Sequence, residues 1–416
     1  MKRLLLLAAT TGYQTRLFAD AARALDIEPV LATDRCHVLE DPWGDRAIPV
    51  RFDEPDSSAE RLAEEGRRQP FDAIVAVADR PTLLAALTAE KLRMPYNSPA
   101  SVAASRNKHR ARQLYQAGGL PVPSFFRVPL DSDPRAAAQL APFPCVLKPL
   151  GLSASRGVIR ANDIPEFIAA FERIKALLET PGILMLRDEL DRYIQIESFI
   201  EGREYALEGL LTDGRLNTLA LFDKPDPLDG PFFEETIYVT PSRADRAIQQ
   251  DLIGTTQRAV DALGLTRGPV HAELRHNRQG AWMLEVAARP IGGLCARALH
   301  FDDGVSLEQL ILRHALGEDV SGARLSGPSG VMMIPIPKGG VYQGVTGVDR
   351  AQRVAGIAEV SITAKEGQKL VPLPEGASYL GFIFATGESP QEVERSLRDA
   401  HRQLSFEIAT ALPLVR

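Results

Sequence analysis

The sequence contains few cysteines and no long apolar run. Cys36, Cys145 and Cys295 are the three cysteines of the 416 residues, and they are widely spaced. An odd, scattered set of cysteines provides neither a disulfide framework nor a cluster of zinc ligands. No apolar run approaches the roughly 20 residues that a membrane span requires. We therefore expect a protein of the reducing cytoplasm that has no membrane partner.

The sequence also lacks a basic block. Lys and Arg total 48 and Asp and Glu 54, which gives a formal net charge of −6. This charge balance does not favour nucleic acid as a partner. The start of the chain superficially resembles a signal peptide, but its apolar run at residues 4–9 is too short and no cleavage site follows. We expect a buried strand there instead.

The composition that remains, 45% hydrophobic and 25% charged, is typical of a globular protein of two or three domains. Strand patterns at 2–9, 29–32 and 73–78 alternate with an amphipathic helical pattern at 10–24. This rhythm predicts an α/β fold with a doubly wound parallel sheet. The turn at 10–12 lacks the three-glycine dinucleotide fingerprint, so we infer no nicotinamide cofactor.

The rest of the chain mixes strand and helix patterns, which indicates α+β character. The expected elements are helices at 101–117, 164–178 and 249–263, strands at 145–149 and 194–200, and a hairpin at 205–222. Residues 321–330 are rich in Gly and Ser and predict a linker. Two strands and a helix at 390–404 are expected after it.

The strongest chemical signal is a predicted hairpin that sets two carboxylates side by side. Its first strand contains Glu273, its second contains Glu285, and Arg289 follows. Folding the chain about Gln279 pairs the two glutamates, whose like charges repel. A divalent cation removes this cost, and oxygen ligands suit Mg²⁺ or Mn²⁺. The hairpin therefore predicts a metal site with a cationic side chain beside it, as phosphoryl chemistry requires.

Strand alternation assigns the other hairpin side chains to two faces. Met283 and Ala287 are expected on the face of Glu285, and Leu284 on the opposite one. His271 is expected near Glu273, where it can contact substrate or serve as a structural strand histidine. After the hairpin, Gly292-Gly293 leaves the backbone open for close approach of substrate, or is simply the turn before a short helix.

Three weaker signals precede the hairpin. Lys148 ends a strand and is followed by a loop of small residues that includes Gly151, Ser153 and Ser155. A lysine beside such backbone amides can hold phosphate oxygens, although an ordinary turn explains the loop equally well.

The second signal is the stretch 197–204. Phe199 and Ile200 can lie along a purine edge, and Glu204 can accept hydrogen bonds from ribose hydroxyls. The alternative is a solvated strand end. The third is the stretch 223–238, in which Glu235 and Tyr238 can meet an amine substrate or belong to a surface loop.

In their order along the chain, these motifs resemble the ATP-grasp superfamily. The order runs from Lys108 at a helix start through Lys148, the small-residue loop and Glu-x-Phe-Ile-x-Gly-x-Glu to Glu273 and Glu285. The resemblance covers about residues 100–320. Residues 285–289 with Gly292-Gly293 look most like the L-amino acid ligase (dipeptide synthetase) branch of the carboxylate–amine ligases.

The resemblance implies an ATP-grasp fold in three parts. They are an N-terminal α/β domain at 1–98, a two-part nucleotide-clamping domain at 99–322 with its lid at about 108–196, and a small α+β domain at 323–416. The C-terminal part would cap the active site, form a dimer, or do both. A homodimer is the oligomeric state that the family suggests.

The resemblance also implies how ATP is bound. Lys108 and Lys148 would contact the phosphates, and the loop of Gly151, Ser153 and Ser155 would close over them. Glu197, Phe199 and Ile200 would flank adenine, and Glu204 would bind the ribose.

The chemistry would then fall to the hairpin. Glu273 and Glu285 would bind two Mg²⁺ ions, and Arg289 would stabilise an acyl phosphate and a tetrahedral intermediate. Many family members carry Asn at the position of Ala287 as a further metal ligand. The L-amino acid ligase branch also has alanine here, so Ala287 is interpreted as a mark of that branch. The alternative is that Ala287 weakens metal binding.

The implied reaction joins a small carboxylate to an amine, both expected to be amino acids, with ADP and phosphate released. A carboxylate is a poor electrophile, so phosphoryl transfer must first convert it to an acyl phosphate. The rivals are carboxylation with bicarbonate, a ligation in nucleotide biosynthesis, and a nucleotide-binding module without catalysis. Retention of both lysines, both glutamates and Arg289 argues against the last.

Overall fold

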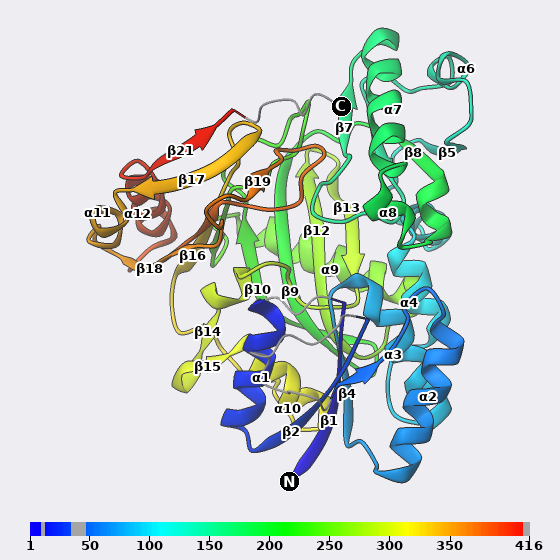
Figure 1. Cartoon of the computed structure of the whole chain (residues 1–416), viewed down its shortest axis with the longest axis vertical. Coiled ribbons are helices and arrows are strands. Elements are labelled where there is room, and N and C mark those ends of the chain that lie inside the picture. The colour runs from blue at the N-terminus through cyan, green and yellow to red at the C-terminus, as the bar shows by residue number, and fades with distance from the viewer. Residues whose placement is uncertain (10–12, 35–46, 411–416) are drawn as a thin grey trace.

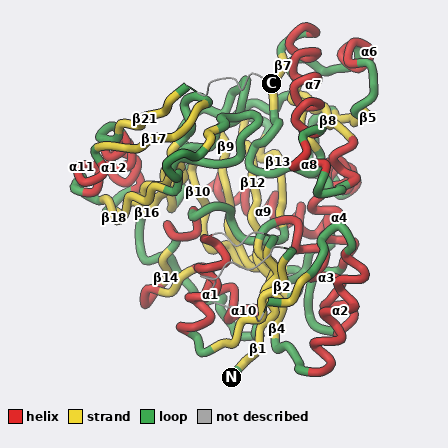
Figure 2. Tube along the Cα trace, viewed as in Figure 1, coloured by secondary structure: helices red, strands yellow, loops and turns green. Residues whose placement is uncertain are grey.

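The computed structural model describes residues 1–9, 13–34 and 47–410. The turn expected at 10–12 and Cys36 lie outside these ranges. Figure 1 shows the N-terminal sheet at the bottom, the long central strands above it, a lid at the upper right and the C-terminal strands at the upper left. Helices flank the strands throughout (Figure 2). The expected mixed α/β architecture is thus confirmed.

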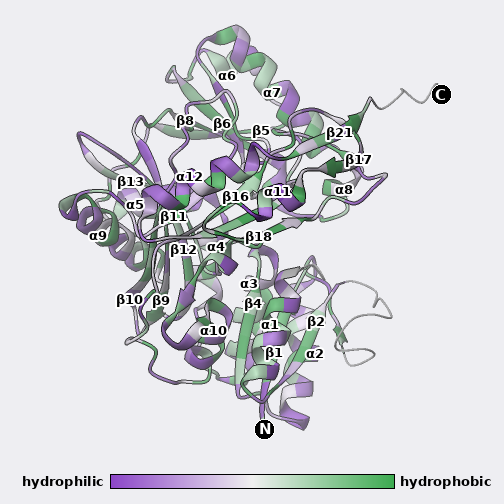
Figure 3. Ribbon diagram, turned by 90° about the vertical axis from the view of Figure 1, so that its left-hand side faces the viewer, coloured by the Kyte–Doolittle hydropathy of each residue, from purple (hydrophilic) through white to green (hydrophobic). Residues whose placement is uncertain are grey.

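The N-terminal part is a four-stranded parallel sheet of order β3-β2-β1-β4. Its strands are β1 (Lys2–Ala8), β2 (Ile27–Thr33), β3 (Ile48–Pro49) and β4 (Ala73–Val77). The helices beside it are α1 (Tyr13–Ala24), α2 (Pro55–Arg68) and α3 (Asp79–Leu92). Strands β1 and β4 are almost wholly buried, as expected for a sheet covered on both faces, and the sheet is strongly apolar in Figure 3. The carboxyl ends of β1 and β4 share one edge.

Two helices occupy the region where we expected one at 101–117. α4 (Pro99–Arg106) and α5 (Lys108–Ala117) meet at Asn107, whose backbone is extended. The Asn107 side chain accepts a hydrogen bond from the Arg110 N–H and so caps α5. The expectation of one continuous helix was wrong because Asn107 satisfies the backbone of a new helix start. Lys108 consequently lies at the first position of α5.

The lid is a four-stranded antiparallel sheet of order β5-β8-β6-β7, covered by helices. Its elements are β5 (Phe125–Pro129), α6 (Pro134–Ala138), β6 (Cys145–Pro149), β7 (Ile159–Ala161), α7 (Ile164–Leu178), α8 (Pro181–Leu184) and β8 (Tyr193–Ser198). The buried face of α7, with Phe167, Phe171 and Ile174, packs in one core with Leu147 and Ile196 of the sheet. Lys148 thereby lies near the end of a firmly packed strand.

The central sheet has eight antiparallel strands in the order β13-β12-β9-β10-β11-β16-β20-β18. They are β9 (Arg203–Thr212), β10 (Arg215–Asp223), β11 (Ile237–Thr240), β12 (Gly268–Asn277), β13 (Gly280–Ala287), β16 (Ser329–Ile334), β18 (Ile357–Ile362) and β20 (Gly381–Thr386). Helix α9 (Arg246–Leu263) packs against this sheet. The sheet crosses the expected domain boundary at 322/323, because Tyr238 of β11 pairs with Val331 of β16.

The other elements of the C-terminal half are β14 (His300–Phe301), β15 (Val305–Ser306), α10 (Leu307–Ala315), α11 (Val348–Gln352), α12 (Pro390–His401) and the three-stranded sheet of β17 (Gly340–Thr346), β19 (Lys369–Leu370) and β21 (Ser405–Ala409). Helix α12 packs against β16 and β20 of the central sheet, whereas α10 packs against α1 of the N-terminal part. Within the described residues, no helix combines the length and apolarity needed to cross a bilayer.

Candidate active site

Strands β12 and β13 place Glu273 directly opposite Glu285, as the sequence predicted. A β-bulge next to this pair changes the rest of the hairpin, because Leu274 pairs with Met283 and leaves Leu284 as the extra residue. Met283 is consequently buried in the apolar core, while Leu284 lines a cavity. The expected faces of these two residues were wrong, since simple alternation assumes an unbroken ladder.

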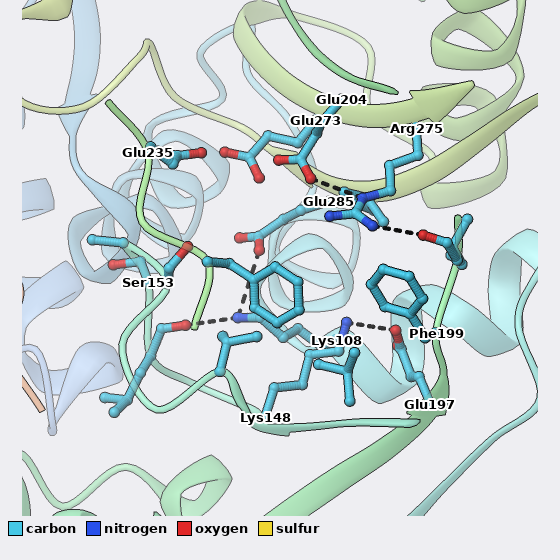
Figure 4. A pocket seen from close by; sticks show the side chains of 18 of the residues that line it. Lys108, Lys148, Ser153, Glu197, Phe199, Glu204, Glu235, Glu273, Arg275 and Glu285 are labelled. Carbon is cyan, nitrogen blue, oxygen red and sulfur yellow. Dashed lines mark hydrogen bonds and ion pairs between the residues drawn. The ribbon is translucent and has the colours of Figure 1, made fainter. Parts of the chain in front are cut away.

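Most of the predicted site residues surround one open cavity between the lid and the central sheet (Figure 4). Those that line it are Lys108, Lys148, Ser153, Ser155, Glu197, Phe199, Ile200, Glu204, Glu235, His271, Glu273, Glu285 and Arg289. Gly151, Gly292, Gly293 and Tyr238 are not in its lining. Tyr238 is instead buried against Phe222.

A buried ion-pair network lies at the base of the lid. The Glu197 carboxylate forms ion pairs with Lys148, at 2.5 Å from Oε2 to Nζ, and with Arg112, at 2.9 Å from Oε1 to Nε. Arg112 also donates a hydrogen bond to the Leu284 carbonyl. Burial alone would raise the pKa of Glu197, but the two cations outweigh it and lower the pKa to about 2. The ionised carboxylate holds Lys148 at the cavity wall. The sequence analysis missed Arg112, although it lies four residues after Lys108 on the same helix face.

Lys108 links the small-residue loop to the hairpin of Glu273 and Glu285. Its ammonium donates to the Leu152 carbonyl at 2.7 Å and lies 3.6 Å from Glu285 Oε2. Ser153, Ala154 and Ser155 of the loop line the cavity beside it. The loop therefore presents its small residues next to the positive charge of Lys108, as a phosphate-binding segment requires.

The C-terminal part of the chain holds the far end of this loop. The Gly157 N–H donates to the Pro374 carbonyl and Arg156 Nε to the Glu375 carbonyl, both at 2.7 Å. The Glu375 carboxylate also pairs with Arg173 of α7. Gly157 has a φ of +74°, and a Cβ there would lie 2.7 Å from Pro149 Cγ. Only glycine therefore fits this position without strain.

Three carboxylates surround the ammonium of Lys224. Its Nζ lies 2.8 Å from Glu204 and 3.5 Å from Glu273, and it also pairs with Glu235. Burial would lower the pKa of Lys224, but these carboxylates raise it well above its usual value. In Figure 4 the three glutamates point toward one another. Their closest oxygens lie within 4.8 Å, so this all-oxygen donor set also suits a hard divalent cation.

Both nitrogens of His271 face carboxylates. Nδ1 pairs with the buried Glu208, and Nε2 lies 3.4 Å from Glu273 Oε1. Burial would lower the pKa of His271, but Glu208 and Glu273 together raise it to about 9. A second Glu208 oxygen accepts the Ile291 N–H at 3.1 Å. His271 thus borders the cavity while Glu208, which was not foreseen, fixes it to the segment after Arg289.

Apolar side chains form the inner end of the cavity. Phe199 and Phe233 stack with ring centroids 6.4 Å apart, and Val146 and Val158 lie beside them in the lining. Arg275 lies 5.0 Å from the Phe199 ring and donates to Glu204 at 2.9 Å. The cavity thus has an apolar wall next to the fixed carboxylate of Glu204.

Arg289 projects into the cavity from the segment after β13. Its Nε and Nη2 donate to the two carboxylate oxygens of Asp79 at 3.0 and 3.1 Å, and its Nη1 donates to the Pro290 carbonyl at 3.0 Å. Burial would lower the pKa of Arg289, but Asp79 raises it, so the side chain stays charged. The sequence analysis missed Asp79, although an acid directly after a parallel strand lies where such sheets bind ligands.

Family models match most of the chain in three consecutive segments. An ATP-grasp N-terminal domain matches residues 19–96, an ATP-grasp domain residues 141–298, and an L-amino acid ligase C-terminal domain 2 residues 332–409. The chain belongs to the ATP-grasp superfamily and carries the C-terminal module of L-amino acid ligases.

Individual proteins agree with this assignment. The L-amino acid ligase from Bacillus licheniformis superposes with a TM-score of 0.81 over 99% of both chains at 24% identity, which shows the shared fold. The alanine–anticapsin ligase of Bacillus subtilis is 28% identical over 50% of this chain and 46% of its own length. A D-alanine–D-alanine ligase of Pseudomonas putida is 28% identical over 54% of this chain and 68% of its own length. The chain thus matches about half the length of the anticapsin ligase.

Proposed function

We propose that this protein is an ATP-dependent carboxylate–amine ligase that joins amino acids and releases ADP and phosphate. The observation that carries this proposal is the pairing of Glu273 with Glu285 beside Arg289, in one cavity with Lys108 and Lys148. The alanine–anticapsin and D-alanine–D-alanine ligases among the relatives are named for joining amino acids, which supports the same reaction here.

The chain's own groups can bind ATP across the cavity. The apolar wall formed by Phe199 and Phe233 suits adenine, and Glu204, fixed by Lys224 and Arg275, suits the ribose hydroxyls. Lys108 and Lys148 are placed for the phosphates, with Ser153 and Ser155 covering them. Lys224 is buried behind Glu204, Glu235 and Glu273 and outside the cavity lining, so it would act by holding these carboxylates.

The donor set fits divalent metal. Glu273 and Glu285 offer only carboxylate oxygens, at a spacing where two like charges without a cation repel. These two residues would hold Mg²⁺, and two ions are the stoichiometry we propose. When bound, Mg²⁺ neutralises the charge that develops between the phosphates and the acceptor carboxylate. Ala287 adds no oxygen ligand, so the two glutamates carry this role.

Arg289 would bind the reacting oxygens. Its guanidinium can hold an acyl phosphate or a tetrahedral oxyanion through two parallel hydrogen bonds. The small-residue loop, held at its far end by residues 374–375, would keep water from the acyl phosphate. Glu235, which pairs with Lys224, borders the same cavity and would meet the incoming ammonium group there.

Three expectations stay predictions here: a homodimer, a cytoplasmic location, and substrate contacts by Tyr238, Gly292 and Gly293. Tyr238 is buried behind Lys224, 5.0 Å from ring centroid to Nζ, so any role would act through that lysine.

The test is ADP release with Mg-ATP across single amino acids, amino acid pairs and bicarbonate, with products identified by mass. We expect release that requires an acid and an amine, and a product one water lighter than their sum. Release with bicarbonate alone would replace the proposal with the carboxylase reaction. Release that never depends on an amino acid would reject it.

A further inference from the structure

The carboxyl edge of the N-terminal sheet reaches across to the segment that carries Arg289. α3 begins with Asp79, directly after β4, and α1 contributes Gln14. Asp79 binds the Arg289 guanidinium, and Gln14 Nε2 donates to the Ile291 carbonyl at 3.0 Å. Both contacts come from the strand ends where open parallel sheets bind their ligands. The N-terminal sheet therefore holds this segment at two points.

The guanidinium of Arg289 has five N–H donors in a fixed plane. Asp79 takes two of them, the Nε–H and one Nη2–H, which form the side of the group. The Pro290 carbonyl takes one Nη1–H. One hydrogen on Nη1 and one on Nη2 remain, and both nitrogens belong to the end of the group. Two donors are thus left for a further oxyanion, and Arg289 borders the cavity.

We propose that Asp79 is the positioning residue for Arg289, gripping the side of the guanidinium so that its end faces the reacting carboxylate. This inference rests on the proposed ligase function. The Asp79 side chain is one quarter exposed and sits at the N-terminus of α3, where the helix dipole favours a carboxylate. The two hydrogen bonds to Asp79 fix the orientation of the Arg289 guanidinium before any substrate binds. Correct orientation of a catalytic group can raise the reaction rate by a large factor.

The test compares two conservative substitutions in the same domain. Asp79→Asn keeps the shape but loses the charge and one of the two acceptor oxygens. Asp34→Asn is the matched control, because Asp34 also pairs with an arginine, Arg80, at 3.3 Å and is 26% exposed. We expect Asp79→Asn to lower kcat on the order of 10- to 100-fold, with the KM for ATP unchanged. Asp34→Asn should leave both constants unchanged.

A double-mutant cycle separates positioning from general structural support. If Asp79 acts through Arg289, then Asp79→Asn has little further effect on kcat in the Arg289→Lys background, where the fork is already absent. Equal losses in both backgrounds, or a wild-type kcat for Asp79→Asn, would overturn the proposal.

A readout without turnover keeps this inference distinct from the ligase assignment. The ¹⁵N resonance of the Arg289 Nε–H, assigned by its loss in Arg289→Lys, should be protected from exchange in the unaltered protein and lose that protection in Asp79→Asn. If the resonance is unprotected in the unaltered protein, or if its protection is unchanged in Asp79→Asn, then Asp79 does not hold the Arg289 guanidinium as proposed. If no amino acid promotes ADP release, the ligase function is rejected instead. The exchange protection of the Arg289 Nε–H would still show whether Asp79 pairs with Arg289.

Discussion

Glu273 and Glu285 lie opposite each other in one strand pair, yet their carboxylates are matched to different lysines. Glu273 lies 3.5 Å from Lys224, and Glu285 lies 3.6 Å from Lys108. Each ammonium group offsets part of the repulsion between the two glutamates. Burial would raise the pKa of Glu273, but Lys224 and His271 lower it, so this carboxylate stays ionised.

Glu285→Gln tests the metal assignment. The substitution removes a charged ligand without changing side-chain size, so we expect turnover to fall on the order of 100-fold or more while the fold is retained. Steady-state ADP release and thermal unfolding measure the two effects. Glu201→Gln, an exposed neighbour on the loop after β8, is the control. Activity like that of the unaltered protein in Glu285→Gln would refute the metal role.

Arg289→Lys tests the role of the guanidinium fork. Lysine keeps the positive charge but offers no pair of parallel donors, so kcat should fall by orders of magnitude, on the scale of roughly 100-fold. Binding of ATP should be unaffected, as judged by its KM. An effect confined to the KM for ATP would show that Arg289 is a nucleotide ligand.

Glu197 makes stability depend on acid pH. Its pKa is lowered from 4.5 to about 2 by Arg112 and Lys148, so its stabilisation is complete above about 4.5 and is lost as pH falls toward 2. Such a shift corresponds to roughly 3 kcal/mol of unfolding free energy. Urea unfolding of the unaltered protein and Glu197→Gln should show a large difference near neutral pH that narrows in acid. A difference independent of pH would contradict this linkage.

Gly157→Ala tests whether the loop geometry matters for ATP. A residue with a Cβ at φ +74°, pressed against Pro149, costs on the order of 1–3 kcal/mol unless the loop moves. We expect a higher KM for ATP, measured by steady-state kinetics, because the loop can no longer cover the phosphates. Gly182→Ala is the control, since a Cβ there meets no atom within 4 Å. Equal KM values in the two variants would separate the loop from ATP binding.

Much of the fold could be predicted from local sequence patterns. The helix expected at 164–178 has the observed bounds, because Asp163 caps its start and Pro165 occupies its first turn. The pairing of Glu273 with Glu285 followed from strand alternation and a short turn. These features depend on residues close in sequence.

The missed features depend on contacts between distant segments or on small irregularities. The bulge at Leu284 changes the face of two side chains but leaves no pattern in the sequence. Asp79 meets Arg289 only after two domains pack, across 210 positions of sequence. Lys224 was not predicted as a site residue, because its three carboxylate partners come from different elements of the fold.

The most direct test of the central claim follows one oxygen atom. The amino acid whose carboxylate is phosphorylated is labelled with ¹⁸O in both carboxylate oxygens. If an acyl phosphate forms, attack by the amine must release one labelled oxygen with the phosphate. Mass analysis should therefore find one ¹⁸O atom in each phosphate formed during ligation. Unlabelled phosphate accompanying a condensed product would contradict activation of the carboxylate by phosphoryl transfer.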